Sequence, residues 1–205
     1  MIGIINYGSG NIAALMNIFK QRKIPYCLCS TPQELAAADR FLLPGVGAFD
    51  PTMRQLTQSG ITDALRIEVF DKRKPVLGIC VGMHLLADAS DEGNLPGLGW
   101  IKGQVRKINH HKLSTLPHLP HMGWNSVNLH GYSPLLDGID AAQGFYFLHS
   151  YYLDSASPDD KSATVNYGDE LTCAVERDIV FGVQFHPEKS HSNGVRLLQN
   201  FAKLN

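Results

Sequence analysis

The sequence predicts an α/β fold: a mostly parallel open sheet with helices on both faces and appended antiparallel strands. Residues 1 to 92 alternate short apolar runs with helical patterns, which is the order of a parallel sheet. From Gly93 onward, turns built on Gly and Pro separate short strands, which is typical of hairpins and edge strands. Ligands of parallel sheets bind at the carboxyl ends of the strands, so a site is expected there.

Length and composition are those of one ordinary globular domain spanning residues 1–205. The 205 residues are 44% hydrophobic and 18% charged, with a net charge of -1, which gives no nucleic-acid footprint. No apolar run approaches the roughly 20 residues of a membrane helix, and the N-terminus lacks a signal-peptide pattern. Four cysteines are too few for a disulfide scaffold, so we expect reduced thiols and a cytoplasmic location. No cofactor and no metal ion are predicted.

The first half is expected to contain strands and helices in alternation. The predicted elements are a strand at 2–6, a helix at 11–22, a strand ending at 29, a helix capped by Thr31, a strand at 40–43 and helical residues 51–73. The turn Gly8-x-Gly10-x-x-Ala13 also fits a loose dinucleotide fingerprint. The second strand ends without the acidic residue that such a site needs, so a nucleotide site is disfavoured.

A strand, a sharp corner and a helix are predicted around Cys80. Residues 75–79 form an apolar strand, a helix is expected from about Gly82, and the spacing Gly78-x-Cys80-x-Gly82 is that of a nucleophile elbow with sulfur in place of oxygen. Glycines flank such a corner because side chains there would clash, and a helix N-terminus favours the thiolate. A buried structural cysteine is the alternative interpretation of the same pattern.

A glycine turn follows the strand that ends at Leu43. Its sequence, Pro44-Gly45-Val46-Gly47, leaves backbone N–H groups free at a strand end, where they can hold a phosphate or an oxyanion. A plain tight turn is the alternative.

In the second half, strands are predicted at 99–108, 125–129, 144–152, 163–167, 171–176 and 179–185, with a final helix at 193–203. The loop holding His110, His111, His118 and His121 matches no common metal spacing, and we expect it to be solvated. His149, on an aromatic strand, is expected in a wall of the core.

His186 and Glu188 supply what a cysteine nucleophile requires. A thiol needs a base, and the base needs an acceptor that orients it. His186 ends a buried strand, Pro187 fixes the turn, and Glu188 follows. Taken alone, His-x-Glu is more often an exposed turn, but its presence beside an elbow indicates catalysis.

These residues resemble the class I, triad-type glutamine amidotransferases. Within them the chain is most similar to the glutaminase subunits of imidazole glycerol phosphate synthases. The resemblance covers essentially the whole chain and lies in segments 6–11, 43–49, 77–83, 120–125, 145–151 and 182–190.

The resemblance implies a role for each matching residue. Cys80 would attack the side-chain amide of glutamine and form a thioester, His186 would move the protons, and Glu188 would orient His186. The backbone N–H of Val81 and one from the Val46–Gly47 turn would hold the oxyanion. Ser150 and Tyr151 match the segment that holds the α-groups of glutamine.

The resemblance also implies a heterodimer with a (β/α)8-barrel synthase (cyclase) subunit, which receives ammonia and produces imidazole glycerol phosphate and AICAR in histidine biosynthesis. A docking face is expected at Asn11, Trp124, Asn125 and Lys189.

One position departs from the family pattern. His84 stands where the family usually carries Gln, four residues after the nucleophile, where a side chain can reach the glutamine pocket. Substrate affinity or pH dependence is therefore expected to differ. Two alternatives stay open: a paralogous glutaminase that feeds a sugar-aminating synthase, and a non-catalytic subunit that senses glutamine. The intact triad argues against the second.

Overall fold

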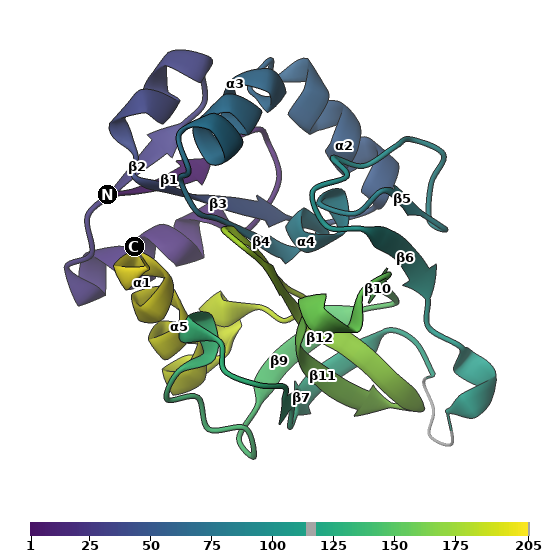
Figure 1. Cartoon of the computed structure of the whole chain (residues 1–205). Coiled ribbons are helices and arrows are strands. Elements are labelled where there is room, and N and C mark those ends of the chain that lie inside the picture. Colours follow the sequence, from purple (N-terminus) through teal and green to yellow (C-terminus); the bar gives the residue numbers. More distant parts are fainter. Residues whose placement is uncertain (114–117, 205) are drawn as a thin grey trace.

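The computed structural model describes residues 1–113 and 118–204 and contains a large mixed sheet (Figure 1). Its parallel part has the order β2 (Tyr26–Cys29), β1 (Ile2–Ile5), β3 (Arg40–Gly45), β4 (Val76–Cys80) and β13 (Val180–Val183). Antiparallel strands β12 (Asp169–Arg177), β11 (Lys161–Tyr167) and β8 (Asn128–Leu129) extend it. The predicted fold class is confirmed.

Helices cover both faces of the parallel strands. Figure 1 shows α2 (Phe49–Gln58) and α3 (Thr62–Arg66) on one side, with α1 (Ile12–Arg22) and α5 (His191–Lys203) on the other. A π-helical turn, Ile67–Asp71, continues α3, and the short helix α4 (Val81–Leu85) follows β4 directly. None of the helices in the described part of the chain is long and apolar enough to cross a membrane.

Two smaller sheets belong to the second half of the chain. One has the order β10 (Tyr151–Ser155), β6 (Gly103–Lys107) and β5 (Ala89–Ser90). The other pairs β7 (His121–Asn125) with β9 (Phe145–His149), antiparallel and with His121 opposite His149. Between β9 and β10 lies Ser150, so the two small sheets meet at the segment that the sequence predicts to bind substrate.

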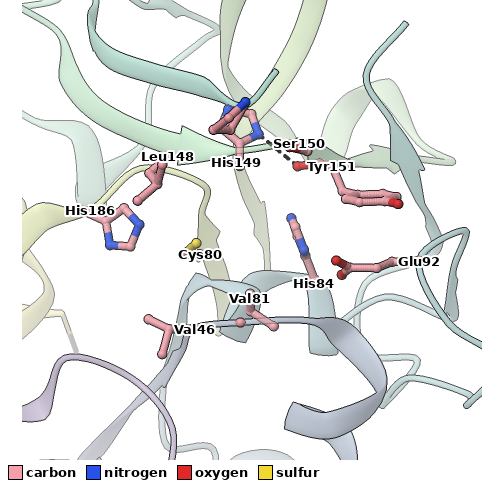
Figure 2. A pocket seen from close by; sticks show the side chains of 12 residues that line it. Val46, Cys80, Val81, His84, Glu92, Leu148, His149, Ser150, Tyr151 and His186 are labelled. Atoms are coloured by element: carbon pink, nitrogen blue, oxygen red, sulfur yellow. Dashed lines mark hydrogen bonds between the residues drawn. The ribbon is translucent and has the colours of Figure 1, made fainter. Parts of the chain in front are cut away.

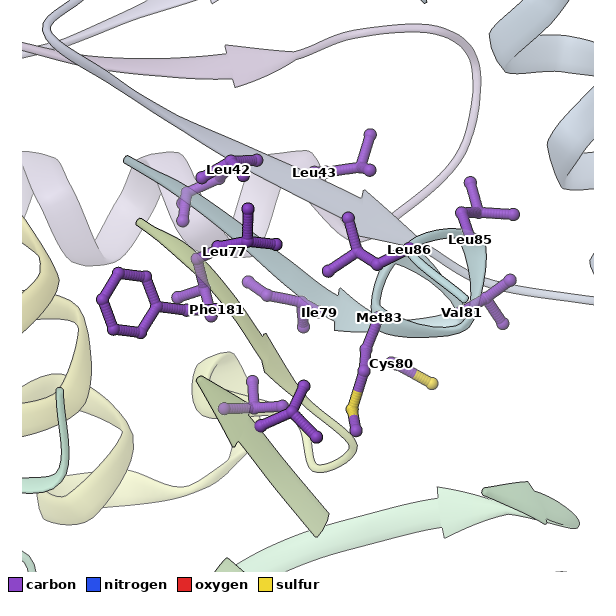
Figure 3. Packing of buried hydrophobic residues seen from close by; sticks show 14 of the residues in the cluster. Leu42, Leu43, Leu77, Ile79, Cys80, Val81, Met83, Leu85, Leu86 and Phe181 are labelled. Carbon is purple, nitrogen blue, oxygen red and sulfur yellow. The ribbon is translucent and has the colours of Figure 1, made fainter. Parts of the chain in front are cut away.

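The core lies around the central strands β3, β4 and β13 (Figure 3). Leu42, Leu77, Val183 and Phe181 are buried there. A parallel strand that is covered on both faces reads as a continuous apolar run, which explains the sequence of β4. Pairing of β4 with β13 brings the corner at Cys80 beside the chain that leads to His186.

Several predicted elements differ in detail. The helix expected after Thr31 is a 3-10 helix, Pro32–Ala37, although its capping box is present. Such helices stay short because their hydrogen-bond geometry is poorer than that of an α-helix. The strand expected at 125–129 is divided between β7 and β8. Further 3-10 turns occur at His110–Lys112, Pro134–Leu136, Pro158–Asp160 and Pro187–Lys189.

The prediction of a solvated histidine loop is wrong for His121. His110 and His111 are exposed, whereas His121 is buried on β7 with its ring stacked against Phe147 and Tyr167. Because a ring stacked on both faces is removed from water, burial lowers its pKa, here to about 4. Pro117, which the sequence places in the same loop, lies outside the described residues.

Candidate active site

Cys80 occupies the corner between β4 and α4. Its backbone has φ 54° and ψ -115°, a strained conformation for a residue other than glycine. A Cβ on Gly82 would lie 1.8 Å from the carbonyl oxygen of Leu43, and one on Gly78 would lie 2.7 Å from that of Gly82. Only glycine permits this close approach of α4 to β3, so the corner has the tightness expected of a nucleophile elbow.

His186 and Glu188 form a buried pair beside this corner. His186 Nδ1 donates to Glu188 Oε1 at 3.0 Å, which leaves Nε2 free to face Cys80. Burial opposes a charge on the imidazole, but the interactions with Cys80 and Glu188 outweigh it and raise the pKa of His186 to about 10. A charged imidazolium next to sulfur favours the thiolate, which is the nucleophilic form.

A pocket of about 320 Å³ opens over Cys80 (Figure 2). Such a volume suits a small-molecule ligand. Its lining is drawn from the turn after β3, the elbow, the β9–β10 corner and the chain after β13, and consists of Val46, Gly47, Cys80, Val81, His84, Glu92, Pro120, Leu148, His149, Ser150, Tyr151 and His186. The catalytic, oxyanion and substrate residues expected from the sequence therefore lie together, with Glu188 directly behind His186.

A family model described as "Glutamine amidotransferase class-I" matches residues 4–204. The chain belongs to this family. The amidotransferase has relatives that are similar over their entire length. It is 48% identical over 204 residues to the imidazole glycerol phosphate synthase subunit HisH of Leptospira interrogans, with 100% of both chains covered. It is also 48% identical over 209 residues to the subunit of the same name from Bdellovibrio bacteriovorus, again with 100% of both covered.

Solved structures share the fold of this amidotransferase at low sequence identity. A crystal structure of a glutamine amidotransferase has a TM-score of 0.72 at 18% identity and covers 98% of this chain and 96% of its own. The glutaminase domain of Trypanosoma brucei CTPS, with bound acivicin, has a TM-score of 0.66 at 16% identity and covers 100% of this chain and 94% of its own. These likenesses concern the fold alone.

The turn after β3 is tied to the turn after β1. Val46 N–H donates to Ser9 Oγ at 2.9 Å, and Ser9 Oγ donates to Val46 O at 3.1 Å. Thr52 Oγ1 also donates to Val46 O, at 3.2 Å. The N–H of Val46 is thus engaged by a serine in this conformation. Gly47 has φ 94°, a left-handed conformation that suits glycine, and a Cβ there would meet open space.

Glu92 is a pocket residue that sequence reasoning missed. Its Oε2 accepts from the backbone N–H of Phe49 at 2.9 Å. Burial, which exceeds the effect of this hydrogen bond, raises the pKa of Glu92. A glutamate in the turn Asp91-Glu92-Gly93 carries no local signal of a site, because only the path of the chain between α4 and β6 aims it at the pocket.

His149 contributes to the pocket and to a hydrogen-bonded line behind it. Its Nδ1 donates to Tyr151 O at 2.8 Å, and its Nε2 lies 2.9 Å from Nδ1 of His121. Asn125 Nδ2 lies 3.3 Å from Nε2 of His121. Burial lowers the pKa of His149 to about 3, so this ring stays neutral.

The residues expected at a docking face are not among those that line the pocket. Trp124 is 42% exposed and stacks on His191, while Lys189 lies over the ring of Tyr146 at 5.4 Å. Asn11 is exposed, and Asn125 is half-buried and donates to Asn166 O at 3.0 Å.

Proposed function

We propose that this chain is the glutaminase subunit of an imidazole glycerol phosphate synthase. It hydrolyses glutamine to glutamate and passes ammonia to a (β/α)8-barrel subunit that makes imidazole glycerol phosphate and AICAR. The observation that carries the proposal is the cluster of Cys80, His186 and Glu188 beside one pocket, in a chain whose full-length relatives are HisH subunits.

The reaction begins with the Cys80 thiolate. Sulfur attacks the carbon of the glutamine side-chain amide, and the His186 imidazolium protonates the departing nitrogen, so that ammonia leaves and a thioester remains. His186, now neutral, takes a proton from water, whose oxygen attacks the thioester carbon. The C–S bond breaks, glutamate leaves, and the thiolate–imidazolium pair is restored. Glu188 holds the Nδ1–H of His186 throughout.

The oxyanion requires backbone donors. Val81 N–H, at the start of α4, is one, and the second comes from the Val46–Gly47 turn. One such donor is worth about 2.7–4 kcal/mol of barrier. Because Val46 N–H is bonded to Ser9, this peptide must turn before it can donate to substrate.

The other end of the pocket suits the α-groups of glutamine. Glu92 supplies a carboxylate for the α-ammonium group, and Ser150 and Tyr151 supply polar atoms at the opposite wall. His84 lies between this end and Cys80, where it limits the depth of the pocket (Figure 2).

Exposed apolar residues at the pocket support docking of the barrel subunit over it. Val46, Met122, Trp124 and Leu148 are exposed hydrophobic residues; Val46 and Leu148 line the pocket, and Met122 pairs with Leu148 across β7 and β9. Docking over these residues would cover the pocket and keep ammonia from water, where it would mostly be protonated.

A cytoplasmic location suits the four cysteines, all of which are free thiols.

Replacement of the nucleophile tests the proposal. In the complex with the barrel subunit, Cys80→Ala is expected to abolish glutamine-dependent synthesis and to leave ammonia-dependent synthesis intact. Assays with glutamine and with ammonium salt, followed by the appearance of imidazole glycerol phosphate, separate the two. Cys173→Ala, at a buried thiol that does not line the pocket, is the matched control. Equal loss of both activities in Cys80→Ala would contradict a channelled-ammonia mechanism.

A further inference from the structure

Gln184 is a buried polar residue that the reaction above does not use. It is fully buried and follows β13, where its backbone N–H donates to Cys173 O at 2.8 Å. Its side-chain amide lies between the nucleophile and His84. Gln184 Nε2 is 4.0 Å from Cys80 Sγ, and Gln184 Oε1 is 2.7 Å from His84 Nε2.

The orientation of this amide depends on which nitrogen of His84 carries the proton. An amide has one donor end and one acceptor end, so the end that faces His84 decides which end faces sulfur. Burial lowers the pKa of His84 to about 4, against the opposing effects of Gln184 and of the backbone of Tyr151, so the ring is neutral and carries one proton. With that proton on Nε2, His84 donates to Gln184 Oε1 and the NH2 group faces Cys80. With the proton on Nδ1, the amide would turn and present its oxygen to sulfur.

We propose that His84 is a positioning residue, which donates from Nε2 to Gln184 Oε1 and thereby keeps the Gln184 NH2 group facing Cys80 Sγ. A donor facing sulfur favours the thiolate, whereas a carbonyl oxygen would disfavour it. At 4.0 Å the N–H···S contact is a dipole acting on a charge rather than a short hydrogen bond, so its effect is moderate. The inference rests on the proposed role of Cys80 as nucleophile.

The titratable groups that face this cluster are Tyr7, Glu92, His149 and His186, of which Glu92 lies beside His84 in the pocket (Figure 2). Tyr7 donates its hydroxyl to Pro44 O at 2.6 Å, and burial raises its pKa further. His186 interacts with Cys80, and the pKa of His149 is lowered chiefly by burial and further by its neighbours His121, His84 and His186. All four groups are retained in every variant of the test, so differences in rate between variants report on His84 and Gln184.

The test measures the reactivity of the Cys80 thiol directly. Iodoacetamide alkylates thiolates, so its rate at Cys80, followed by peptide mass spectrometry between pH 5 and 9, reports the thiolate fraction. The probe needs neither glutamine nor a partner. His84→Leu, which has no donor, is expected to slow alkylation at pH 7 by about threefold to tenfold and to move the profile to higher pH. His84→Gln, whose Nε2 can donate in the same place, is expected to stay within about twofold of wild type.

A double-variant comparison shows whether His84 acts through Gln184. Gln184→Leu should slow alkylation as His84→Leu does, and the double variant should be no slower than Gln184→Leu alone. His130→Leu removes a similar contact, 2.8 Å from His130 Nε2 to Thr164 Oγ1, between residues that do not line the pocket, and should leave the rate unchanged.

Two results would overturn the proposal: an unchanged alkylation profile in His84→Leu, or additive losses in the double variant. Far-UV circular dichroism identifies a variant that fails to fold. If His84→Leu does not fold, alkylation of His84→Gln tests the proposal, because a loss of Cys80 reactivity in a variant that retains a donor contradicts it. One further outcome separates the two proposals: the wild type and its variants show the expected alkylation rates, while the wild type has no glutaminase activity with its barrel subunit. In that case the proposed function fails while the His84–Gln184 inference stands.

Discussion

Burial alone would keep the His186 ring neutral, because desolvation disfavours a charged imidazole. The side chains of His186 and Glu188 are only 6% and 3% exposed, so the opposing attraction acts with little screening by water. Glu188 has a second oxygen, Oε2, which is buried and has no hydrogen-bond partner among the residues that the structure describes. At the residue scale, the Glu188 carboxylate therefore has only one oxygen in a hydrogen bond, and its charge acts chiefly on His186.

Removal of that charge should change the pH dependence of the reaction. Glu188→Gln is expected to lower the pKa of His186. Burial, which lowers this pKa, stays the same in the variant, whereas the charge of Glu188, which raises it, is lost. Since ammonia departure needs the imidazolium, the alkaline limb of kcat/KM should move to lower pH, by about one unit or more. Measurement of glutamate release from pH 6 to 10 with the barrel subunit checks this.

Glu176→Gln is the matched control. This carboxylate is half-buried and accepts from Ser133 Oγ, and it does not line the pocket. An unmoved alkaline limb in Glu188→Gln, or the same shift in both variants, would contradict the role of Glu188.

At the scale of elements, the site lies where turns at the ends of parallel strands touch. The turn after β1 holds the turn after β3 through Ser9 and Val46, and the elbow after β4 packs against β3 through Gly82. Asn11, expected at the partner interface, lies two residues beyond Ser9 on the same turn. The proposed interface and the proposed oxyanion turn are therefore joined through the turn after β1.

The Ser9 contact should restrain the oxyanion turn. Val46 N–H cannot donate to Ser9 and to an oxyanion at once, so Ser9→Ala lowers the cost of turning the peptide. A net hydrogen bond contributes about 0.5–1.5 kcal/mol, so glutaminase activity without the partner should rise by about threefold to tenfold. Steady-state glutamate release by the isolated subunit measures it.

Thr52→Val provides the comparison. Thr52 Oγ1 bonds only to carbonyl oxygens, those of Val46 and Ala48, and leaves Val46 N–H untouched. A smaller change is expected there. If Ser9→Ala lowers the activity of the isolated subunit, the Ser9 contact supports the active conformation instead and the prediction fails.

At the scale of the whole molecule, three buried histidines make stability depend on pH. Burial lowers the pKa to about 4 for His84 and His121 and to about 3 for His149. Each has a folded-state pKa below its unfolded value of about 6.5. As pH falls below 6.5, the unfolded chain binds protons that the folded chain does not, so the folded state loses stability.

The free energy of unfolding should fall by about 1 kcal/mol per buried histidine between pH 6.5 and 5.5. His186 acts weakly in the opposite sense, because its raised pKa keeps it protonated in the folded state while the unfolded chain still gains protons at this position in the same window. Glu92 and Glu176 act in the opposite sense, since burial raises their pKa values. Urea unfolding of wild type and His121→Gln at both pH values checks the prediction. The variant should lose about 1 kcal/mol less than wild type on acidification, and an equal loss would contradict it.

Exposed His110 provides the control for this comparison. His110→Gln should lose as much stability as wild type on acidification. A reduced loss in that variant would mean that surface histidines, rather than buried ones, set the slope.

Much of the site was predictable because its signals are local. The elbow needs glycines at 78 and 82 for steric reasons that act within five residues, and His186 and Glu188 are joined by one turn. Alternation of strands and helices then predicts the parallel sheet, and with it the edge where these segments end.

The remaining contacts join segments far apart in the chain, where sequence carries no pairing information. Pairing of β4 with β13, with Ile79 opposite Val183, decides that Cys80 and His186 meet. A slip of one residue would turn the side chains of β13 to the other face. Glu92 and Gln184 enter the site only through the paths of their loops. The sequence by itself determined the fold class and predicted the nucleophile, because both follow from local sterics and periodicity. Tertiary packing alone decided which distant side chains surround that nucleophile.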